Sequence, residues 1–553
     1  MMRCLVLMFG LFWFIPGALA TCLSPFKDRG FIDHHNLRKL QPSRKSLSSQ
    51  VTEIKANLDK ASEYRITHYV LFSRGFESLV CYDFEVPEIG NVGSKAFSPY
   101  CEHRRNAALY SSYLRLALRY ADSKGIRVFF HTNQFEFPNE IYTAFGDLMK
   151  GTAPVCPGKE FVWELFRGKI REFFQKFPEC DGLQITADET QVSALSCQCP
   201  DCKNMTVGQR IDRMIYEAAK VCEELGKELQ VRTWGRVGEL EQERDPSQML
   251  DNLPEGVVVS IKNTRGDFYL TEPISNMIGF GDDRQVVEFD CWGEYMGWNN
   301  FPCYLGDVLS ERMKLIAEKK VCRVAARLSW DPFTNYIFDQ PWGNEVNVYV
   351  YSKLAQDPGL NPDDLLNEWV ATKFPPECRS AAFRLYKRSA ELQKVWMTLQ
   401  GWNANDHSRV FYNPNSTYQR VIDKVDPDKR TYSEADLNKR RKDIDAALRE
   451  AEKLIEDLGP TLTPEFRNNL LHGAKTEWFV AHGVTNELDL LRISSTFKEG
   501  QAPPDLATVS RRIRKFDEEW QRYDPIGYKT YFGMAPLQML DEIMKTREGT
   551  QEF

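Results

Sequence analysis

The feature that most constrains the fold is a repeated alternation of short apolar runs and amphipathic stretches between residues 66 and 328. The runs are continuous in apolar character, which is typical of strands buried on both faces of a parallel sheet. They are Ile66–Phe72, Ile126–His131, Gly182–Ala187, Leu229–Trp234, Val257–Lys262, Gln285–Trp292 and Val321–Leu328. The 3.6-residue period predicts helices between them at Arg104–Lys124, Lys159–Phe177, Val207–Gly226 and Asp307–Lys319.

Seven strand–helix units are clear in this pattern, and an eighth is ambiguous. Regular alternation of strand and helix indicates the α/β class, and the number of units favours a closed (β/α)8 TIM barrel over an open sheet. We expect the barrel over residues 61–345. Residues 21–45 are polar and irregular, so residues 21–60 are interpreted as a lead segment followed by one helix.

After about Asn344 the alternation stops, and residues 346–553 have the pattern of helices joined by polar loops. The clearest helix is Asp436–Leu458, which carries an apolar stripe and is followed by Gly459 and Pro460. We therefore predict an all-α C-terminal domain after the barrel. Such a domain also offers a surface for a homodimer.

The charge balance narrows the range of partners. The chain has 553 residues, with 71 Lys and Arg against 78 Asp and Glu, a net charge of −7. This argues against a basic nucleic-acid-binding surface. Beyond the N-terminus the sequence holds no long apolar run, so we expect no membrane span.

The first twenty residues have the pattern of a signal peptide. Arg3 gives a short positive region, Leu5–Ile15 is apolar but short for a membrane span, and Ala18-Leu-Ala20 fits a cleavage site. The prediction is a mature chain that begins at Thr21 and is secreted or periplasmic.

Fourteen cysteines are present, and thirteen remain once Cys4 leaves with the signal peptide. The densest group is Cys197-Gln-Cys199-Pro-Asp-Cys202. Three thiolates at this spacing could join a fourth ligand around zinc. The favoured interpretation is a loop held by disulfides to Cys180, Cys156 or Cys222, since no second CxxC pair follows at zinc-ribbon spacing. We therefore predict no metal and no cofactor.

Candidate site residues follow from the barrel, because reactive side chains of TIM barrels stand at the carboxyl ends of the strands. The positions at and after the ends of the apolar runs hold carboxylates, amides, cations and aromatic rings: His131, Asn133, Asp188, Glu189, Arg232, Trp234, Lys262, Asn263, Asp267, Trp292 and Glu294. Paired carboxylates are the machinery of glycoside hydrolysis. Two cations beside them match an acidic sugar.

Each assignment has a structural alternative. Asp188 and Glu189 fit a helix N-cap and its first turn, and Asp267 fits a turn residue after Gly266. Lys262 could pair only with one of the acids. His131 fits a hydrogen-bonded core imidazole.

Four collinear segments resemble the xylan α-glucuronidases of glycoside hydrolase family 67. They are Tyr113–Phe130, Val257–Pro273, Val287–Gly297 and Gly343–Trp369, and the resemblance extends over residues 60–375. That family is inverting and acts on an α-linked glucuronic acid. The family has an α/β domain before its barrel, whereas the segment before residue 61 is too short here to hold one.

The resemblance implies a role for each matched residue. Glu189 would be the general acid, Asp267 and Glu294 would activate water, and Lys262 and Arg232 would hold the uronate carboxylate. The acid stands in a different local pattern from the family's, so Asp188 remains a rival. The predicted sugar-binding residues are Lys262, Arg232, Trp234, Asn133, His131, Trp292 and Asn263.

Two other functions stay open at this point. The adjacent Asp188 and Glu189 also resemble the pair of β-hexosaminidases, in which the aspartate orients a substrate acetamido group and the glutamate is the acid. A barrel of this kind could alternatively bind carbohydrate without catalysis, since a fold does not fix a function.

Overall fold

The structure is a computed structural model. It describes residues 25–34, 44–72, 76–133, 136–186, 197–232, 253–280, 284–330, 337–340, 342–399, 402–403, 432–498, 506–529 and parts of 536–545. The predicted signal peptide over residues 1–20 lies outside these residues.

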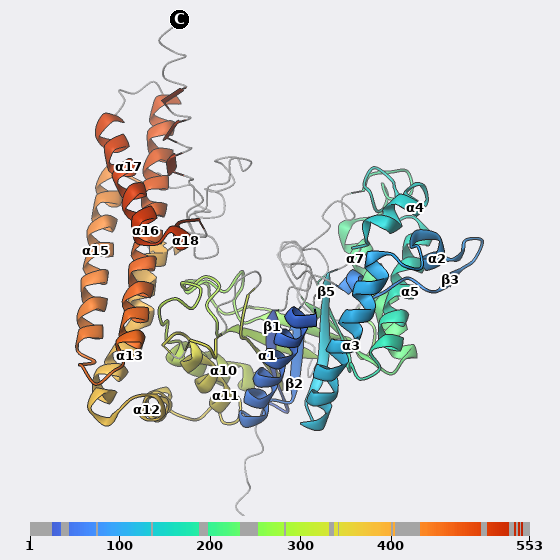
Figure 1. The fold of residues 1–553 in the computed structure, drawn as a ribbon, viewed down its shortest axis with the longest axis horizontal. Coiled ribbons are helices and arrows are strands. Elements are labelled where there is room, and N and C mark those ends of the chain that lie inside the picture. Colours follow the sequence, from blue (N-terminus) through green and yellow to red (C-terminus); the bar gives the residue numbers. More distant parts are fainter. Residues whose placement is uncertain are drawn as a thin grey trace, which may run out of the picture.

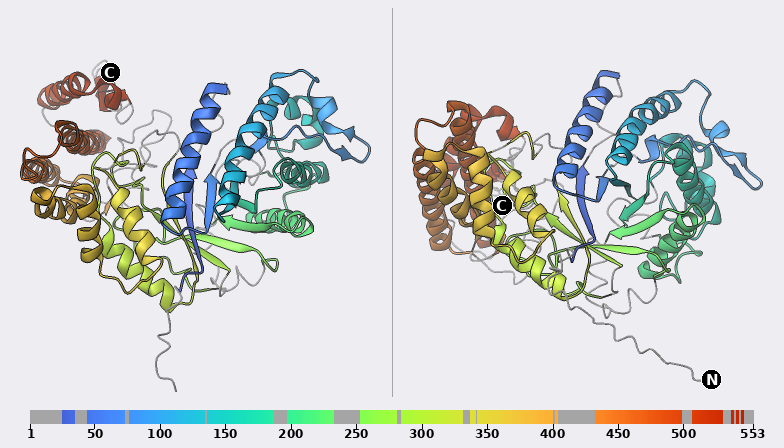
Figure 2. Two further views of the ribbon diagram at one scale, coloured as in Figure 1. Left: turned by 60° about the horizontal axis from the view of Figure 1, so that its bottom comes forward. Right: turned by 90° about the horizontal axis from the view of Figure 1, so that it is seen from below.

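Eight parallel strands close into a barrel in the order β1-β10-β9-β8-β7-β6-β5-β2. This confirms the predicted (β/α)8 architecture (Figure 2). The strands are β1 (Asp28–His34), β2 (His68–Phe72), β5 (Arg127–Asn133), β6 (Gly182–Thr186), β7 (Glu228–Arg232), β8 (Val258–Lys262), β9 (Gln285–Asp290) and β10 (Arg323–Arg327). Every register is parallel, including the pairing of β1 with β10 that closes the cylinder.

The eighth strand corrects the sequence analysis. Strand β1 lies inside the segment interpreted as polar and irregular, so that interpretation was wrong for Asp28–His34, and the barrel begins before residue 61. The strand escaped detection because only Phe31 and Ile32 are apolar among its seven residues. Its residues Asp28, Asp33 and His34 are buried at the two ends of the barrel, where polar partners compensate Asp28 and Asp33.

Helices surround the strands (Figures 1 and 2). Their bounds are α1 (Arg44–Glu63), α3 (Glu102–Ser123), α5 (Glu160–Lys176), α7 (Val207–Glu224), α10 (Gly306–Glu318) and α11 (Glu345–Leu354), with α2 (Val92–Ala96) and α4 (Asn139–Met149) in the loops. Helix α7 begins with a capping box in which Thr206 and Gln209 exchange side-chain and backbone hydrogen bonds.

Inside the cylinder, inward-facing side chains form three layers, because alternate residues of each strand point to the axis. The middle layer is apolar on one side and polar on the other. Its apolar part is a separate cluster of Ile32, Val70, Phe129, Val258, Val286 and Ala325. Its polar part is Gln184, which donates to Gln230 (3.2 Å) and Ser260 (3.4 Å).

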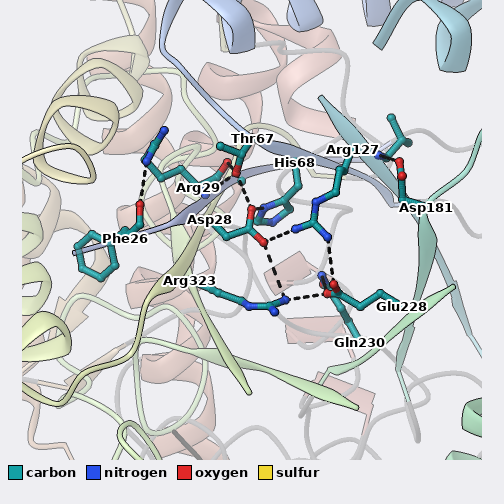
Figure 3. Close-up of polar contacts among 12 residues, drawn as sticks. Phe26, Asp28, Arg29, Thr67, His68, Arg127, Asp181, Glu228, Gln230 and Arg323 are labelled. Carbon is teal, nitrogen blue, oxygen red and sulfur yellow. Dashed lines mark hydrogen bonds and ion pairs between the residues drawn. The ribbon is translucent and has the colours of Figure 1, made fainter. Parts of the chain in front are cut away.

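The layer at the amino ends of the strands is an ion network (Figure 3). The carboxylate of Asp28 binds Nδ1 of His68 (2.7 Å) and Nη2 of Arg127 (2.5 Å). Glu228 binds Arg127 (3.0 Å) and Arg323 (2.9 Å). Burial alone would raise the pKa of Asp28, but His68 and Arg127 hold it far below its ordinary value. This end of a TIM barrel serves stability rather than chemistry.

Within the described residues the C-terminal part is almost entirely helical, as predicted, and its helices stand beside the barrel (gold to red in Figure 1). They are α12 (Pro362–Lys373), α13 (Arg379–Met397), α15 (Glu434–Glu456), α16 (Pro464–Lys498) and α17 (Leu506–Tyr523), with a small β11–β12 hairpin (Thr398–Leu399 and Trp402–Asn403). Within the described residues, no helix is both long and apolar enough to span a membrane.

The helical domain packs on the loop that follows β9. Ser389 on α13 accepts the backbone N–H of Tyr304 (2.9 Å), and Gln393 donates to the carbonyl of Phe301 (3.3 Å). The ring of Phe301 meets Trp396 edge to face at 5.3 Å between centroids. The barrel loop and helix α13 therefore share one packed interface.

Candidate active site

The third inward layer, at the carboxyl ends of β7–β10, gathers charged residues. Five stand on strands and two in the loops after β8 and β9: Arg232, Lys262, Glu288, Asp290 and Arg327, with Asp267 and Glu294. All are buried except Asp267, which is half-buried. Buried charges at these positions require partners.

Three ion pairs provide those partners. Nε of Arg232 donates to both carboxylate oxygens of Glu288 (2.9 Å each), and Glu288 also accepts from the hydroxyl of Ser260 (2.6 Å). Lys262 binds Asp267, and Arg327 binds Glu294. Each cation of the layer is therefore paired with an acid of the protein.

Asp267 is held as a carboxylate. It accepts from Nζ of Lys262 on one oxygen and from the hydroxyl of Tyr295 (2.5 Å) on the other. Burial raises the pKa of Asp267, but Lys262, Tyr295 and the positive charge of Arg327 lower it by more. The net shift of this pKa is therefore downward. An ionised carboxylate with fixed geometry can accept a proton from water.

Arg327 lies at the centre of the charged layer. Burial alone would lower its pKa, but the acids around it, of which Glu294 and Asp290 act most strongly, raise it. Asp267 is among these acids. The ring of Phe268 lies 4.9 Å from the Arg327 guanidinium and 5.2 Å from Nζ of Lys262. The acids Asp267 and Glu294 are thus brought together around one arginine.

The turn that carries Glu294 is fixed by Asp290, the last residue of β9. Its carboxylate accepts the backbone N–H groups of Trp292 (3.1 Å), Gly293 (3.0 Å) and Glu294 (2.7 Å). Burial raises the pKa of Asp290 to about 6, with Arg327 opposing and Glu294 adding to the shift. Asp290 therefore positions Glu294 through the backbone.

Lys262 and Arg232, the two predicted uronate-binding cations, lie in the layer, but in this structure each neutralises an acid of the protein. The alternative reading of Lys262 as the partner of a neighbouring acid matches this arrangement.

Asn263 and Trp292 are built into the scaffold. Asn263 donates to the carbonyl of Glu288 (2.7 Å) and accepts from Arg312. Trp292 is fully buried in the main core, and its carbonyl accepts from Asn344 (2.8 Å). Neither side chain offers an exposed platform for a sugar.

His131 is fully buried on β5, with Nε2 2.6 Å from Oγ1 of Thr186. This placement agrees with the core-imidazole alternative. Asn133 ends the same strand, and its side chain lies outside what the structure describes. Asp188, Glu189 and Trp234 also fall outside the described residues, so their predicted roles stay predictions.

Sequence reasoning did not single out Glu288, Asp290, Tyr295 or Arg327. The sequence holds a signal that could have identified three of them. Glu288 and Asp290 alternate with apolar residues in β9, and Arg327 directly follows the apolar residues Val324-Ala-Ala326 in β10. A charge inside a continuous apolar strand is costly unless it is paired, so it marks a buried ionic site.

Four cysteines form a second cluster away from the charged layer. The Sγ atoms of Cys156, Cys197, Cys199 and Cys202 lie within 4.8 Å of one another, and all four are buried. The predicted disulfides are not formed in this structure, where these cysteines are free, and Cys180 and Cys222 are free as well.

Comparison with known proteins defines the class of fold. No family model matches the chain. An α-glucuronidase A of Emericella nidulans is 28% identical over 137 residues, which is 22% of this chain and 16% of that protein.

Among solved structures, a GH138 enzyme targeting pectin rhamnogalacturonan II aligns with a TM-score of 0.56 and 12% identity. The alignment covers 92% of this chain and 63% of that one, so the chain spans less than two thirds of its length. A GH20 exo-β-N-acetylglucosaminidase from Vibrio harveyi aligns at a TM-score of 0.38 with 12% identity, over 62% of this chain and 56% of its own. The chain thus has a glycoside-hydrolase-like fold, whereas membership of family 67 stays a prediction.

Proposed function

We propose that the protein is an exported glycoside hydrolase that removes a terminal α-linked uronic acid from an acidic oligosaccharide or polysaccharide by inversion. The observation that carries this proposal is the pairing of Asp267 with Lys262 and Tyr295, next to the Glu294–Arg327 pair, at the carboxyl ends of the barrel strands. This is where TIM-barrel enzymes hold their reactive groups.

In the proposed reaction, Asp267 and Glu294 orient a water molecule and take up its proton. The water oxygen bonds to the anomeric carbon as the glycosidic C–O bond breaks, and Glu189 protonates the leaving oxygen. The anomeric configuration is inverted. Glu189 enters through the family resemblance and its position just after β6, and Asp188 remains its rival. Arg327 would hold the carboxylate of Glu294 in position through their ion pair.

Lys262 is proposed to bind the carboxylate of the uronic acid. An ammonium carries three donors, so one that binds Asp267 has the capacity to bind a substrate carboxylate as well. Arg232 is the weaker candidate, because its guanidinium is bound to Glu288 through Nε and both groups are buried. We therefore place uronate selectivity on Lys262 first.

The first experiment is turnover on a panel of uronate-capped and hexosamine-capped oligosaccharides, with the first-formed anomer followed by NMR. Release of a uronic acid of inverted configuration supports the proposal. Turnover only on substrates with a 2-acetamido group would point instead to the β-hexosaminidase alternative. Binding without turnover on any glycan would make the protein a carbohydrate-binding barrel.

The second experiment tests the assignment of Lys262. Lys262→Met is expected to raise KM for a uronate substrate far more than for its carboxyl-reduced, neutral analogue. Lys314→Met, at an exposed position of α10, is the matched control and should change neither value. An equal effect of Lys262→Met on both substrates would reduce Lys262 to the partner of Asp267.

A further inference from the structure

We propose that Cys156, Cys197, Cys199 and Cys202 bind one Zn²⁺ ion as a structural tetrathiolate site. The four Sγ atoms lie within 4.8 Å of one another. Sγ of Cys156 is 3.3 Å from that of Cys199 and 3.4 Å from that of Cys202. The spacing of the other three cysteines did not identify a fourth ligand. In the structure it is Cys156, which precedes Cys197 by 41 residues (197 − 156).

The sulfur positions fit a tetrahedron better than two disulfides. With Zn–S bonds of about 2.3 Å, the sulfurs of a tetrahedral site are separated by about 3.8 Å. A disulfide brings one pair to about 2.05 Å and leaves each sulfur with a single partner. Here Cys156 is almost equally distant from two other sulfurs. Four soft ligands in this geometry select zinc or iron, and a closed set of four is typical of structural zinc.

The backbone around the cluster is shaped to admit the sulfurs. A Cβ atom on Gly151 would lie 2.7 Å from Sγ of Cys197, and one on Gly158 would lie 3.1 Å from Sγ of Cys202. Thr152 donates its hydroxyl to Sγ of Cys197 (3.5 Å). Side chains at the two glycines would crowd the space that the metal and its ligands need.

The surroundings also suit the charge of the site. Four thiolates and Zn²⁺ carry a net charge of −2. Lys159 interacts electrostatically with Cys156 and Cys199, and it forms an ion pair with Asp201 (3.0 Å) between Cys199 and Cys202. Arg210 donates to the carbonyl of Cys202 (2.8 Å), which ties the cluster to α7.

The ion would join the connections that follow two neighbouring strands. Cys156 lies between α4 and α5, after β5, and the other three cysteines lie between β6 and α7. The chain from Thr186 to Cys197 carries Asp188 and Glu189. A metal at the cluster would fix one end of that segment, while β6 fixes the other.

The test is the metal content of the full chain, purified without chelators and measured by inductively coupled plasma mass spectrometry. We expect one zinc per chain, and thiols that react with iodoacetamide only after a strong chelator has removed the metal. Replacement by Co²⁺ should give the charge-transfer and visible bands of a tetrahedral thiolate site.

Variants assign the ligands. Cys156→Ser and Cys199→Ser should each lower the zinc content to below about one tenth of the wild-type value. Cys180→Ser, at a buried cysteine outside the cluster, should keep it. Should the ligand variants fail to fold, the wild-type metal content and thiol protection decide alone. Metal-free protein whose mass shows two disulfides, one iron per chain, or thiols that react without chelation would each overturn the proposal.

Discussion

Glu477 is expected to make the free energy of unfolding decrease as the pH rises. The substitution Glu477→Gln should abolish this pH dependence. The side chain is buried on α16, against Gly297 of the loop that carries Glu294: a Cβ on Gly297 would lie 2.7 Å from its Oε1. Its Oε2 has no hydrogen-bond partner among the described residues. Burial raises the pKa of Glu477 from 4.5 to about 8, although a hydrogen bond with Asn300 opposes the shift.

The direction of the effect follows from proton binding. Between pH 4.5 and about 8 the folded protein keeps a proton on Glu477 that the unfolded chain has released. The free energy of unfolding therefore falls as the pH rises through this interval, by about 1.4 kcal/mol per pH unit, and stays level above it. Over the whole interval the loss is about 5 kcal/mol at most. Glu477→Gln has the shape of the protonated acid and nothing to titrate.

Urea denaturation followed by circular dichroism, at about pH 5, 7 and 8.5, measures the difference. Glu477→Gln should resemble the wild type at the lowest pH and exceed it by several kcal/mol at the highest. Glu391→Gln, on the exposed side of α13, is the control and should follow the wild type. Equal pH dependence in wild type and Glu477→Gln, or a variant less stable at pH 8.5, would refute the reasoning.

The remaining predictions concern the two charged ends of the barrel. Asp28→Asn should lower the free energy of unfolding at neutral pH by about 3 kcal/mol, because it removes the charge of a buried carboxylate that is bound to Nδ1 of His68 and Nη2 of Arg127. Since the pKa of Asp28 is lowered by folding, its contribution is present above about pH 4 and is lost in acid, so thermal denaturation should show the gap closing as the pH falls. Asp267→Asn and Glu294→Gln should remove turnover on every substrate, whereas Glu189→Gln should retain it on an activated aryl glycoside, in initial-rate assays. Full activity of Glu189→Gln on a natural glycan would contradict that assignment.

The fold could be predicted from the sequence wherever burial was uniform. Seven strands have largely apolar runs because helices cover their outer faces and much of the middle layer inside the barrel is apolar. Strand β1 has the same environment at Phe31 and Ile32, but it supplies Asp28 to the ion network at one end and Asp33 to hydrogen bonds at the other. Its pairing partners on β2 and β10 are distant in sequence, so its pattern alone could not identify it.

The site could be predicted at residues that follow a strand and less well at residues within one. Asp267, Glu294, Lys262 and Arg232 were selected by position, and the structure brings them into one charged layer. Asn263 was selected on the same ground and faces away, because successive residues of a strand alternate between its two faces and Lys262 takes the inward one.

Arg327 shows why a residue's position relative to the end of a strand was not enough to predict the whole site. It occupies the same inward parity on β10 as Arg232 on β7 and Lys262 on β8, but it stands inside an apolar run and was taken for part of the core pattern. What identifies Arg327 is the set of charges around it: four acids act on it, and they come from one strand, β9, and from the two loops that follow β8 and β9. That convergence is a property of the closed barrel and has no counterpart in the local sequence.

Two supports besides Arg327 hold Glu294 in place. Asp290 fixes the backbone of its turn through three N–H groups, and α13 fixes the far end of the same loop through Ser389 and Gln393. Burying this many charges has a high desolvation cost, so a flexible loop would let Glu294 move away from Arg327 toward water. Through these contacts of Ser389 and Gln393 the helical domain supports the site from outside: it keeps a costly arrangement of charges from relaxing.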